Sequence, residues 1–258
     1  MIDGFTREEL LHEVRVAPRA GLLPLPDTRL VERPGFWQVL TPSLTRGGLN
    51  EVQCSELPAD TCDEIIAATV AEYRALGLRF RWCIDPETRP HDLADRLARQ
   101  GLTRSESSGM ARSTAGLPGG SPAGVTVEEV SLANVDDFTD VMARGWESDP
   151  AALDPMHRQM LTDPASRCRL FLARHEGTPA AASAYTALDR SAYLMGAVTL
   201  SSFRGRGLYR ALVAARLSHA AAGGLALATS VAMESTSAPI LAALGFERVC
   251  SILSYSSD

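Results

Sequence analysis

The stretch that most constrains the fold is Ser191 to Arg210, SAYLMGAVTLSSFRGRGLYR, in which an apolar run leads into a turn rich in arginine and glycine. Residues 193–200 carry no charge, which is typical of a strand buried on both faces. From Leu208 onward, small and apolar residues recur at helical spacing, which predicts a helix. The stretch therefore predicts a strand, a turn and a helix in that order.

The turn between them, Arg204-Gly205-Arg206-Gly207, has the properties of an anion site. Its glycines lie where the first N–H groups of a helix have no partner within that helix. Glycine lets a ligand approach the main chain, and the helix dipole favours negative charge at this end. The two arginines add positive charge, so a phosphate or pyrophosphate is the expected ligand. The alternative interpretation is an ordinary surface turn ahead of a well-capped helix.

Composition narrows the class of protein. The 258 residues are 45% hydrophobic and 22% charged, and the net charge is −6. This acidic balance argues against wholesale nucleic-acid binding, and no apolar stretch reaches the ~20 residues of a membrane helix. The start of the chain is acidic and unlike a signal region, so we expect a cytoplasmic protein. The five cysteines and five histidines are dispersed without metal-ligand spacing, so we expect no metal.

Punctuating residues divide the chain into four parts. Residues 1–27 hold an amphipathic helical pattern and a proline-rich connector, which we interpret as an N-terminal arm. Residues 28–114 alternate strand and helix patterns and form a first domain. Residues 115–123 lie in the glycine- and proline-rich stretch AGLPGGSPAG, which is typical of a linker. Residues 124–258 form the second domain.

The second domain has the predicted order β-α-α-β-β-β-α-β-α-β. This order implies a mixed sheet that is antiparallel at first. The strands on either side of the helix predicted at 204–223 are expected to be parallel neighbours. Glu176-Gly177 predicts a hairpin turn, and Ser131 is the expected N-cap of a helix that ends at Trp146.

A weak internal repeat links the two domains. LARQGLTR at 97–104 aligns with LAALGFER at 241–248, and nothing between Glu51 and Asp63 resembles the glycine turn FRGRG. The run from Arg204 to Tyr209 resembles the (Q/R)xxGx(G/A) signature of the GNAT acyltransferase superfamily, and STSAPILAALGF resembles a later helix of that fold. The resemblance covers about residues 124–257. It implies an α/β (α+β) fold of two tandem GNAT-like domains, each a mixed central sheet flanked by helices, with a degenerate first repeat.

The resemblance also implies a binding site for acetyl-CoA as the acyl donor. In the family this turn holds the pyrophosphate, and the preceding strand splays from the following one so that pantetheine pairs with exposed main chain. Carried over by position, the donor-binding residues are Val198, Thr199, Leu200, Arg204, Gly205, Arg206, Gly207, Leu208, Tyr209 and Arg210.

The sequence departs from the family pattern at positions that bear on the catalytic acid and base. Tyr209 stands where the signature has Gly or Ala, and Leu241 stands where many members have a tyrosine that acts as general acid. By topology Glu234 faces the cleft at the end of a strand, so it is a candidate general base, or else a solvated carboxylate. Tyr209 is the candidate acid, although such a ring more often packs against the sheet.

The expected function is transfer of an acetyl group from acetyl-CoA to an amine of a small molecule by direct attack, without a nucleic-acid or membrane partner. A catalytically silent GNAT-like module that binds CoA or a partner stays open, because Leu241 replaces the tyrosine and the first repeat lacks the turn. Acylation of a protein amine is a third alternative. The sequence leaves the acceptor, the acyl length and the oligomeric state undetermined.

Overall fold

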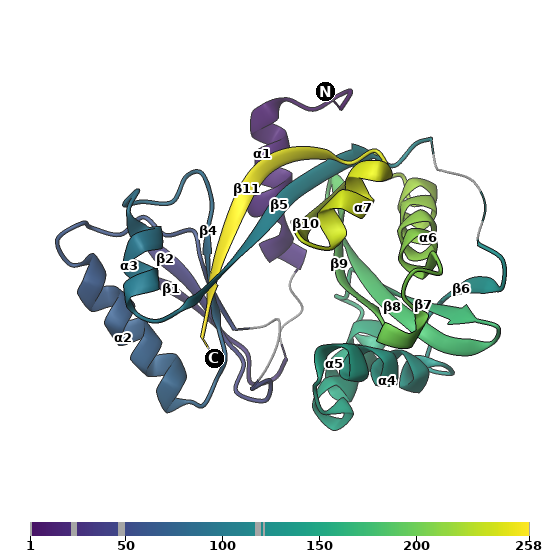
Figure 1. The fold of residues 1–258 in the computed structure, drawn as a ribbon, viewed down its shortest axis with the longest axis horizontal. Helices are drawn as coiled ribbons and strands as arrows, with labels where there is room; N and C mark the ends of the chain where they lie inside the picture. The colour runs from purple at the N-terminus through teal and green to yellow at the C-terminus, as the bar shows by residue number, and fades with distance from the viewer. Residues whose placement is uncertain (1, 22–24, 46–49, 117–119, 121, 258) are drawn as a thin grey trace. The chain divides into compact units, whose positions relative to one another are not determined.

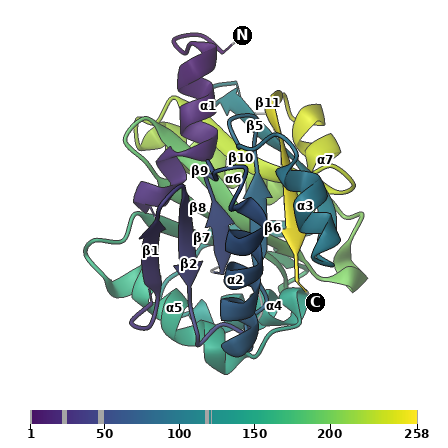
Figure 2. The ribbon, with the colours of Figure 1, turned by 90° about the vertical axis from the view of Figure 1, so that its left-hand side faces the viewer.

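The computed structural model describes residues 2–21, 25–45, 50–116, 120 and 122–257. The chain divides into two compact units, whose elements are drawn in Figures 1 and 2. Unit 1 comprises Met1–Leu23, Gly109–Ala232 and Thr236–Val249, and unit 2 comprises Pro24–Ser108, Met233–Ser235 and Cys250–Asp258.

The sheet of unit 1 begins antiparallel and then becomes parallel. Its successive strands are β6 (Val125–Glu129), β7 (Cys168–His175), β8 (Thr178–Ala187), β9 (Ser191–Thr199) and β10 (Leu227–Met233). The first four pair antiparallel in sequence order, and β9 pairs parallel with β10. Glu176 and Gly177 join β7 to β8 with φ of 49° and 80°, as a tight hairpin turn requires. The predicted strand order and the hairpin are confirmed.

Helices cover both faces of this sheet. They are α4 (Val135–Trp146), α5 (Pro150–Thr162), α6 (Leu208–Ala222) and α7 (Ser237–Ala243). Phe171 and Ala173 of β7 pack in one core with α6 and α7. Leu170 and Leu172 are equally buried but lie outside that core. Because successive strand residues face opposite sides, α4 and α5 cover the second face.

Two predicted helix starts differ from the structure. Ser131 is not an N-cap, since α4 begins at Val135 after Asn134. The Asn134 side chain instead accepts a hydrogen bond from the Ser131 N–H at 2.7 Å, which closes a turn ahead of the helix. The long helix α6 begins at Leu208 and not at Arg204, because Gly207 has φ of 79° and ends the preceding turn in the left-handed region.

The N-terminal arm contributes a helix to unit 1. In α1 (Arg7–Arg15), Thr6 and Glu9 form a capping box, and a 3-10 turn, η1 (Ala17–Gly21), follows. The Ser191 hydroxyl donates to the buried Glu13 carboxylate at 2.6 Å, and Arg190 pairs with Glu9 at 2.8 Å. These contacts hold α1 at the start of β9.

Unit 2 repeats the order of unit 1 on a smaller scale. Its elements are β1 (Arg29–Arg33), β2 (Phe36–Leu40), β3 (Glu51–Gln53), α2 (Cys62–Ala75), β4 (Arg81–Ile84), α3 (Leu93–Arg99) and the first part of β5 (Thr103–Ser113). β1, β2 and β3 pair antiparallel, and β3 pairs parallel with β4. Ile66, Tyr73 and Trp82 are fully buried in its core. The series β1 to β5 thus matches the series β7 to β11, where β11 spans Glu247–Ser256.

The last strand of each series pairs with the other series. β11 pairs antiparallel with β4, and β5 lies next to β10. Both strands therefore have one end in each unit, and the unit boundaries differ from the predicted boundaries at 28–114 and 124–258. The predicted linker at 115–123 stays a prediction, and residues 117–119 and 121 lie outside the described part of the chain.

Candidate functional site

The parallel strands β9 and β10 pair over only part of their length. Their register runs from Ser191 opposite Leu227 to Leu194 opposite Ser230. β9 continues to Thr199, and beyond Leu194 its recorded partners lie on β8. The edge of β9 that faces away from β8 therefore leaves the ladder after Leu194. The predicted splay before the turn is present in unit 1.

A β-bulge lies at the point where β9 leaves β10. Ala184 opposes Met195 and Ala182 opposes Val198, so β9 carries one residue more than β8 across this step. Gly196 lies within the bulge with φ of 57°. An extra residue bends a strand locally and leaves its own polar groups outside the ladder. After the bulge, the main chain of β9 no longer pairs with β10.

The turn after β9 has the backbone expected of an anion cradle. A 3-10 turn, η2 (Ser201–Phe203), leads to Gly205 and Gly207, which have φ of 76° and 79°. Gly207 caps α6 without a side-chain bond, and the first helical bond runs from the Ala211 N–H to the Gly207 carbonyl at 3.0 Å. The N–H groups of residues 208–210 come before that bond and point toward the helix start. The strand, turn and helix predicted from the sequence are confirmed.

The two arginines of the turn are exposed and extend toward different strands. Arg204 Nε donates to the Thr199 carbonyl oxygen at 3.4 Å. Arg206 Nη1 lies 3.5 Å from His175 Nε2, and its guanidinium lies 5.7 Å from the centroid of the Phe203 ring. Within the described residues, no ion pair with a carboxylate involves either arginine. Their positive charge is therefore available to an anionic ligand.

Tyr209 turns its ring into the protein. The ring packs against the core of unit 1, as the packing interpretation expects. Burial raises the pKa of the phenol, and the nearby Arg216 guanidinium partly opposes that rise. Arg216 is itself 1% exposed, and burial lowers its pKa to about 10. The N–H of Tyr209 stays in the first turn of α6, and its role as an acid stays a prediction.

Glu234 directly follows β10 and belongs to unit 2. The Ser108 hydroxyl donates to Glu234 Oε1, and the Glu234 N–H donates to the Glu106 carbonyl at 3.0 Å. Its side chain is half-buried. These contacts fix the carboxylate against β5, and its role as a base stays a prediction.

His219 lies among structural partners. The Tyr185 hydroxyl lies 2.6 Å from His219 Nδ1, and Glu129 lies 3.4 Å from Nε2. The imidazole also meets the edge of Phe171. Tyr185 is buried, and this burial raises its pKa. The group joins the C-terminal half of α6 to β6 and β8.

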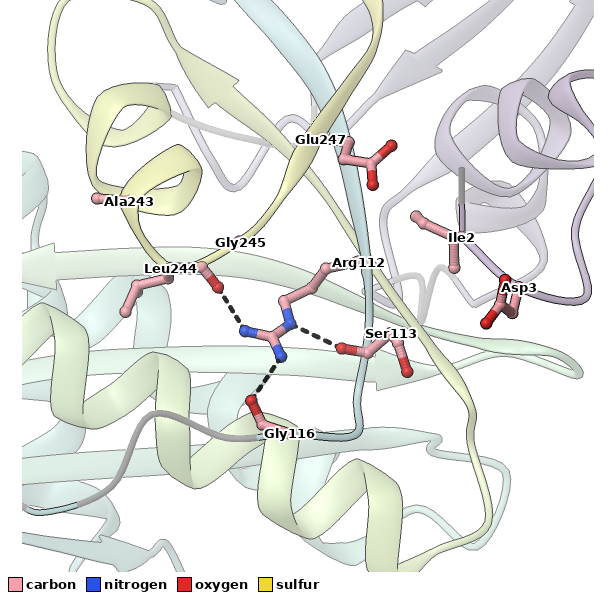
Figure 3. Close-up of a pocket in the computed structure, with 9 residues that line it drawn as sticks. All are labelled: Ile2, Asp3, Arg112, Ser113, Gly116, Ala243, Leu244, Gly245 and Glu247. Atoms are coloured by element: carbon pink, nitrogen blue, oxygen red, sulfur yellow. Dashed lines mark hydrogen bonds between the residues drawn. The ribbon is translucent and has the colours of Figure 1, made fainter.

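A separate pocket of about 460 Å³ lies at the far end of β5 in unit 1 and contains none of the predicted site residues. Arg112 crosses its floor and donates to the carbonyl oxygens of Leu244, Ser113 and Gly116 (Figure 3). Because Leu244 ends α7, the guanidinium caps the carbonyl end of that helix. The Arg112 guanidinium thus ties the end of α7 to β5.

Phe203 directly precedes Arg204 along the chain, whereas no local pattern places His175 at the turn. His175 lies 31 residues before Arg206, at the end of β7, and only the pairing of β7, β8 and β9 brings the two together. Among the described residues, no helix is long and apolar enough to cross a membrane. The same residues contain no group of three or more His, Cys, Asp or Glu side chains that could hold a metal ion.

A known protein family matches the part of the chain that contains the glycine turn. Residues 132–246 match the acetyltransferase (GNAT) family, which confirms the resemblance read from the sequence. This region contains the β9 splay, the bulge and the turn. No curated protein matches the chain.

Solved structures share the fold of both units. A GCN5-related N-acetyltransferase from Kribbella flavida has a TM-score of 0.66 and 21% identity, covering 99% of this chain and 96% of that chain. A tandem GNAT protein from the clavulanic acid biosynthesis pathway has a TM-score of 0.58 and 15% identity, covering 91% and 84%. A functionally unknown protein from Staphylococcus epidermidis has a TM-score of 0.68 and 13% identity, covering 93% and 98%. At these identities the likeness shows the fold alone, and it confirms the predicted tandem GNAT architecture.

Proposed function

We propose that the protein transfers an acetyl group from acetyl-CoA to an amine of a small molecule by direct attack, because residues 132–246 match the acetyltransferase (GNAT) family. The observation that carries this proposal is the strand β9, which leaves β10 at a bulge and ends in the Gly205–Gly207 turn of α6. Such a turn supplies unpaired main-chain donors, and the freed strand supplies an extended edge.

The residues of the turn fit the pyrophosphate of CoA. Among the residues that the structure describes, a Cβ built on Gly205 meets no atom within 4 Å, so the described part of the chain leaves space for a ligand beside this backbone. The N–H groups of residues 205–210 and the Arg204 guanidinium would hold the pyrophosphate. The main chain of Val198, Thr199 and Leu200 would line the pantetheine arm.

Acetyl-CoA supplies a thioester, which accepts the amine nitrogen at its carbonyl carbon and releases a thiolate. In the proposed reaction Glu234 takes the proton that the amine loses, either directly or through water. The phenol of Tyr209 is the proposed proton donor to the thiolate. A phenol is protonated at neutral pH, and burial raises the pKa of Tyr209 further.

A silent CoA-binding module is the second candidate, and one observation favours it. Leu241, at the position of the family's tyrosine, is fully buried in the core of unit 1 and has no acidic group. A module of this kind would bind CoA and release no thiol from acetyl-CoA in the presence of amines.

Calorimetric titration with acetyl-CoA tests the binding part of the proposal. We expect the wild type to bind, and we expect Arg204→Gln to weaken binding about tenfold, since a charge-assisted contact is lost. Arg144→Gln is the matched control, because Arg144 is an exposed arginine of α4 that pairs with Asp140. A wild type that fails to bind at millimolar acetyl-CoA would refute the proposal.

Release of free thiol across a library of amines tests the catalytic part. Turnover with any small amine supports the transferase, whereas binding without turnover supports the silent module. Glu234→Gln is expected to lower kcat by about 10² or more, since a general base contributes on that order. Tyr209→Phe is expected to lower kcat while leaving acetyl-CoA affinity unchanged. An unchanged rate across pH in either variant would remove that residue from the mechanism.

A further inference from the structure

A cluster of three side chains stands beside the glycine turn and has no part in the proposed function. We call Phe203, His175 and Arg206 the Phe203 cluster. The Arg206 guanidinium lies over the Phe203 ring at 5.7 Å, and the His175 ring centroid lies 5.9 Å from that of Phe203. Arg206 and His175 meet at 3.5 Å through Nη1 and Nε2. The Phe203 ring thus lies beside both the Arg206 guanidinium and the His175 imidazole.

The turn directs its two positive charges apart. Arg204 reaches back to the carbonyl of Thr199 in β9, whereas Arg206 reaches to the end of β7. A single pyrophosphate seated on the N–H groups of the turn has a natural partner in Arg204 and the helix start. The Arg206 guanidinium, with the His175 ring beside it, forms a second, separate positive position, and a second anionic group is the ligand that matches it. The Glu176 carboxylate lies 4.0 Å from His175 Nδ1, the ring nitrogen that does not meet Arg206.

The cluster is fixed on the side of the turn that faces Pro122. A Cβ built on Gly207 would lie 2.6 Å from Pro122 Cγ, so this proline packs directly on the backbone of the helix cap. Gly124, two residues further on, accepts a hydrogen bond from the Glu176 N–H at 2.8 Å beside His175. These contacts hold the β7–β8 hairpin and the turn together, so His175 and Arg206 keep their separation without a ligand.

We infer that Arg206 and His175 bind the ribose 3′-phosphate of coenzyme A and so make the protein select coenzyme A over dephospho-CoA. Coenzyme A carries two anionic groups, a pyrophosphate and a phosphate monoester, and the turn offers two cationic positions. Arg206 now donates to His175 Nε2, because a guanidinium has only donors. A bound phosphate accepts from Arg206 in place of the imidazole, and a ring N–H of His175 donates a second bond. This inference rests on the proposed function, since it assigns a part of the same donor.

The test compares the dissociation constants of CoA and dephospho-CoA by calorimetry. In the wild type we expect CoA to bind about tenfold more tightly, which corresponds to about 1.4 kcal/mol. Arg206→Gln and His175→Gln should bring the ratio of the two constants close to one by weakening CoA alone. The matched controls are Arg144→Gln and His12→Gln, which alter exposed residues of α4 and α1 and should keep the wild-type ratio. The ratio should also fall with added salt, because salt screens exposed charges.

The outcomes separate this inference from the proposed function. Equal wild-type affinities for CoA and dephospho-CoA would overturn the inference while leaving donor binding intact. A preference that survives in both Arg206→Gln and His175→Gln would overturn it as well. If the wild type binds neither compound, the proposed function fails, and the inference fails with it.

Discussion

Replacing Gly145 by alanine tests whether the close contact between α4 and β9 fixes the strand at its bulge. A Cβ at this position would lie 2.0 Å from Val198 Cγ1, 2.9 Å from Cγ2 and 3.0 Å from Cβ. Rotation of the valine side chain moves its two methyl groups but not its Cβ. The backbones of α4 and β9 must therefore separate to admit the new methyl group.

Two effects of opposite sign set the size of the change. Alanine stabilises a helix interior by no more than about 1 kcal/mol relative to glycine. Overpacking of a well-packed core costs about 1–3 kcal/mol. We therefore expect Gly145→Ala to lower the free energy of unfolding by about 1–2 kcal/mol, which corresponds to a fall in Tm of roughly 3–6 °C.

Urea unfolding followed by circular dichroism measures the change, and hydrogen exchange of peptides from α4 and β9 locates it. Val198→Ala, alone and combined with Gly145→Ala, completes a double-mutant cycle. Because the truncated side chain leaves room for the new methyl group, we expect a favourable coupling energy of about 1 kcal/mol. If Gly145→Ala is as stable as the wild type, or the two changes are additive, the contact does not restrain β9.

Further changes probe other parts of the fold. Burial lowers the pKa of His157 from 6.5 to about 4. Between pH 6.5 and pH 4 the proton therefore binds mainly to the unfolded chain. The free energy of unfolding falls by up to about 3 kcal/mol as the pH is lowered through this range. His157→Gln should flatten this dependence in urea unfolding, and an unchanged slope would contradict the assignment. Gly207→Ala should weaken acetyl-CoA binding. It should also lower the free energy of unfolding by about 1–2 kcal/mol, because Gly207 has φ of 79°, which a side chain disfavours. Gly224→Ala is the control, because Gly224 has φ of 82° at the other end of α6, and it should lower stability without weakening acetyl-CoA binding. If Gly207→Ala and Gly224→Ala lose affinity equally, the turn has no role in binding. Gly35→Ala places a Cβ 2.5 Å from a backbone carbonyl oxygen, so it should lower Tm more than Gly77→Ala, whose Cβ meets no described atom within 4 Å. Similar shifts in Tm would contradict that expectation.

Local patterns in the sequence were sufficient where neighbours along the chain decide the structure. The uncharged strand, the left-handed glycines and the helix that follows all lie within 20 residues, from Ser191 to Arg210. Their dihedral preferences and apolar spacing act on the same short segment. The helix start was less well predicted, because either Arg204 or Leu208 satisfies the spacing and only the conformation of Gly207 selects one of them.

The sequence by itself determined the turn, its charge and the order of strands and helices in the second domain, since these depend on contacts close along the chain. Only the tertiary structure decided which strands complete each unit, because β5 and β11 present edges that fit either repeat and pairing across long separations selects the partner. The tertiary structure also brought His175 to Arg206 across two strand pairings, and it turned the Tyr209 ring into the core beside Arg216. Side-chain neighbours of this kind follow from packing in three dimensions, which no local pattern records.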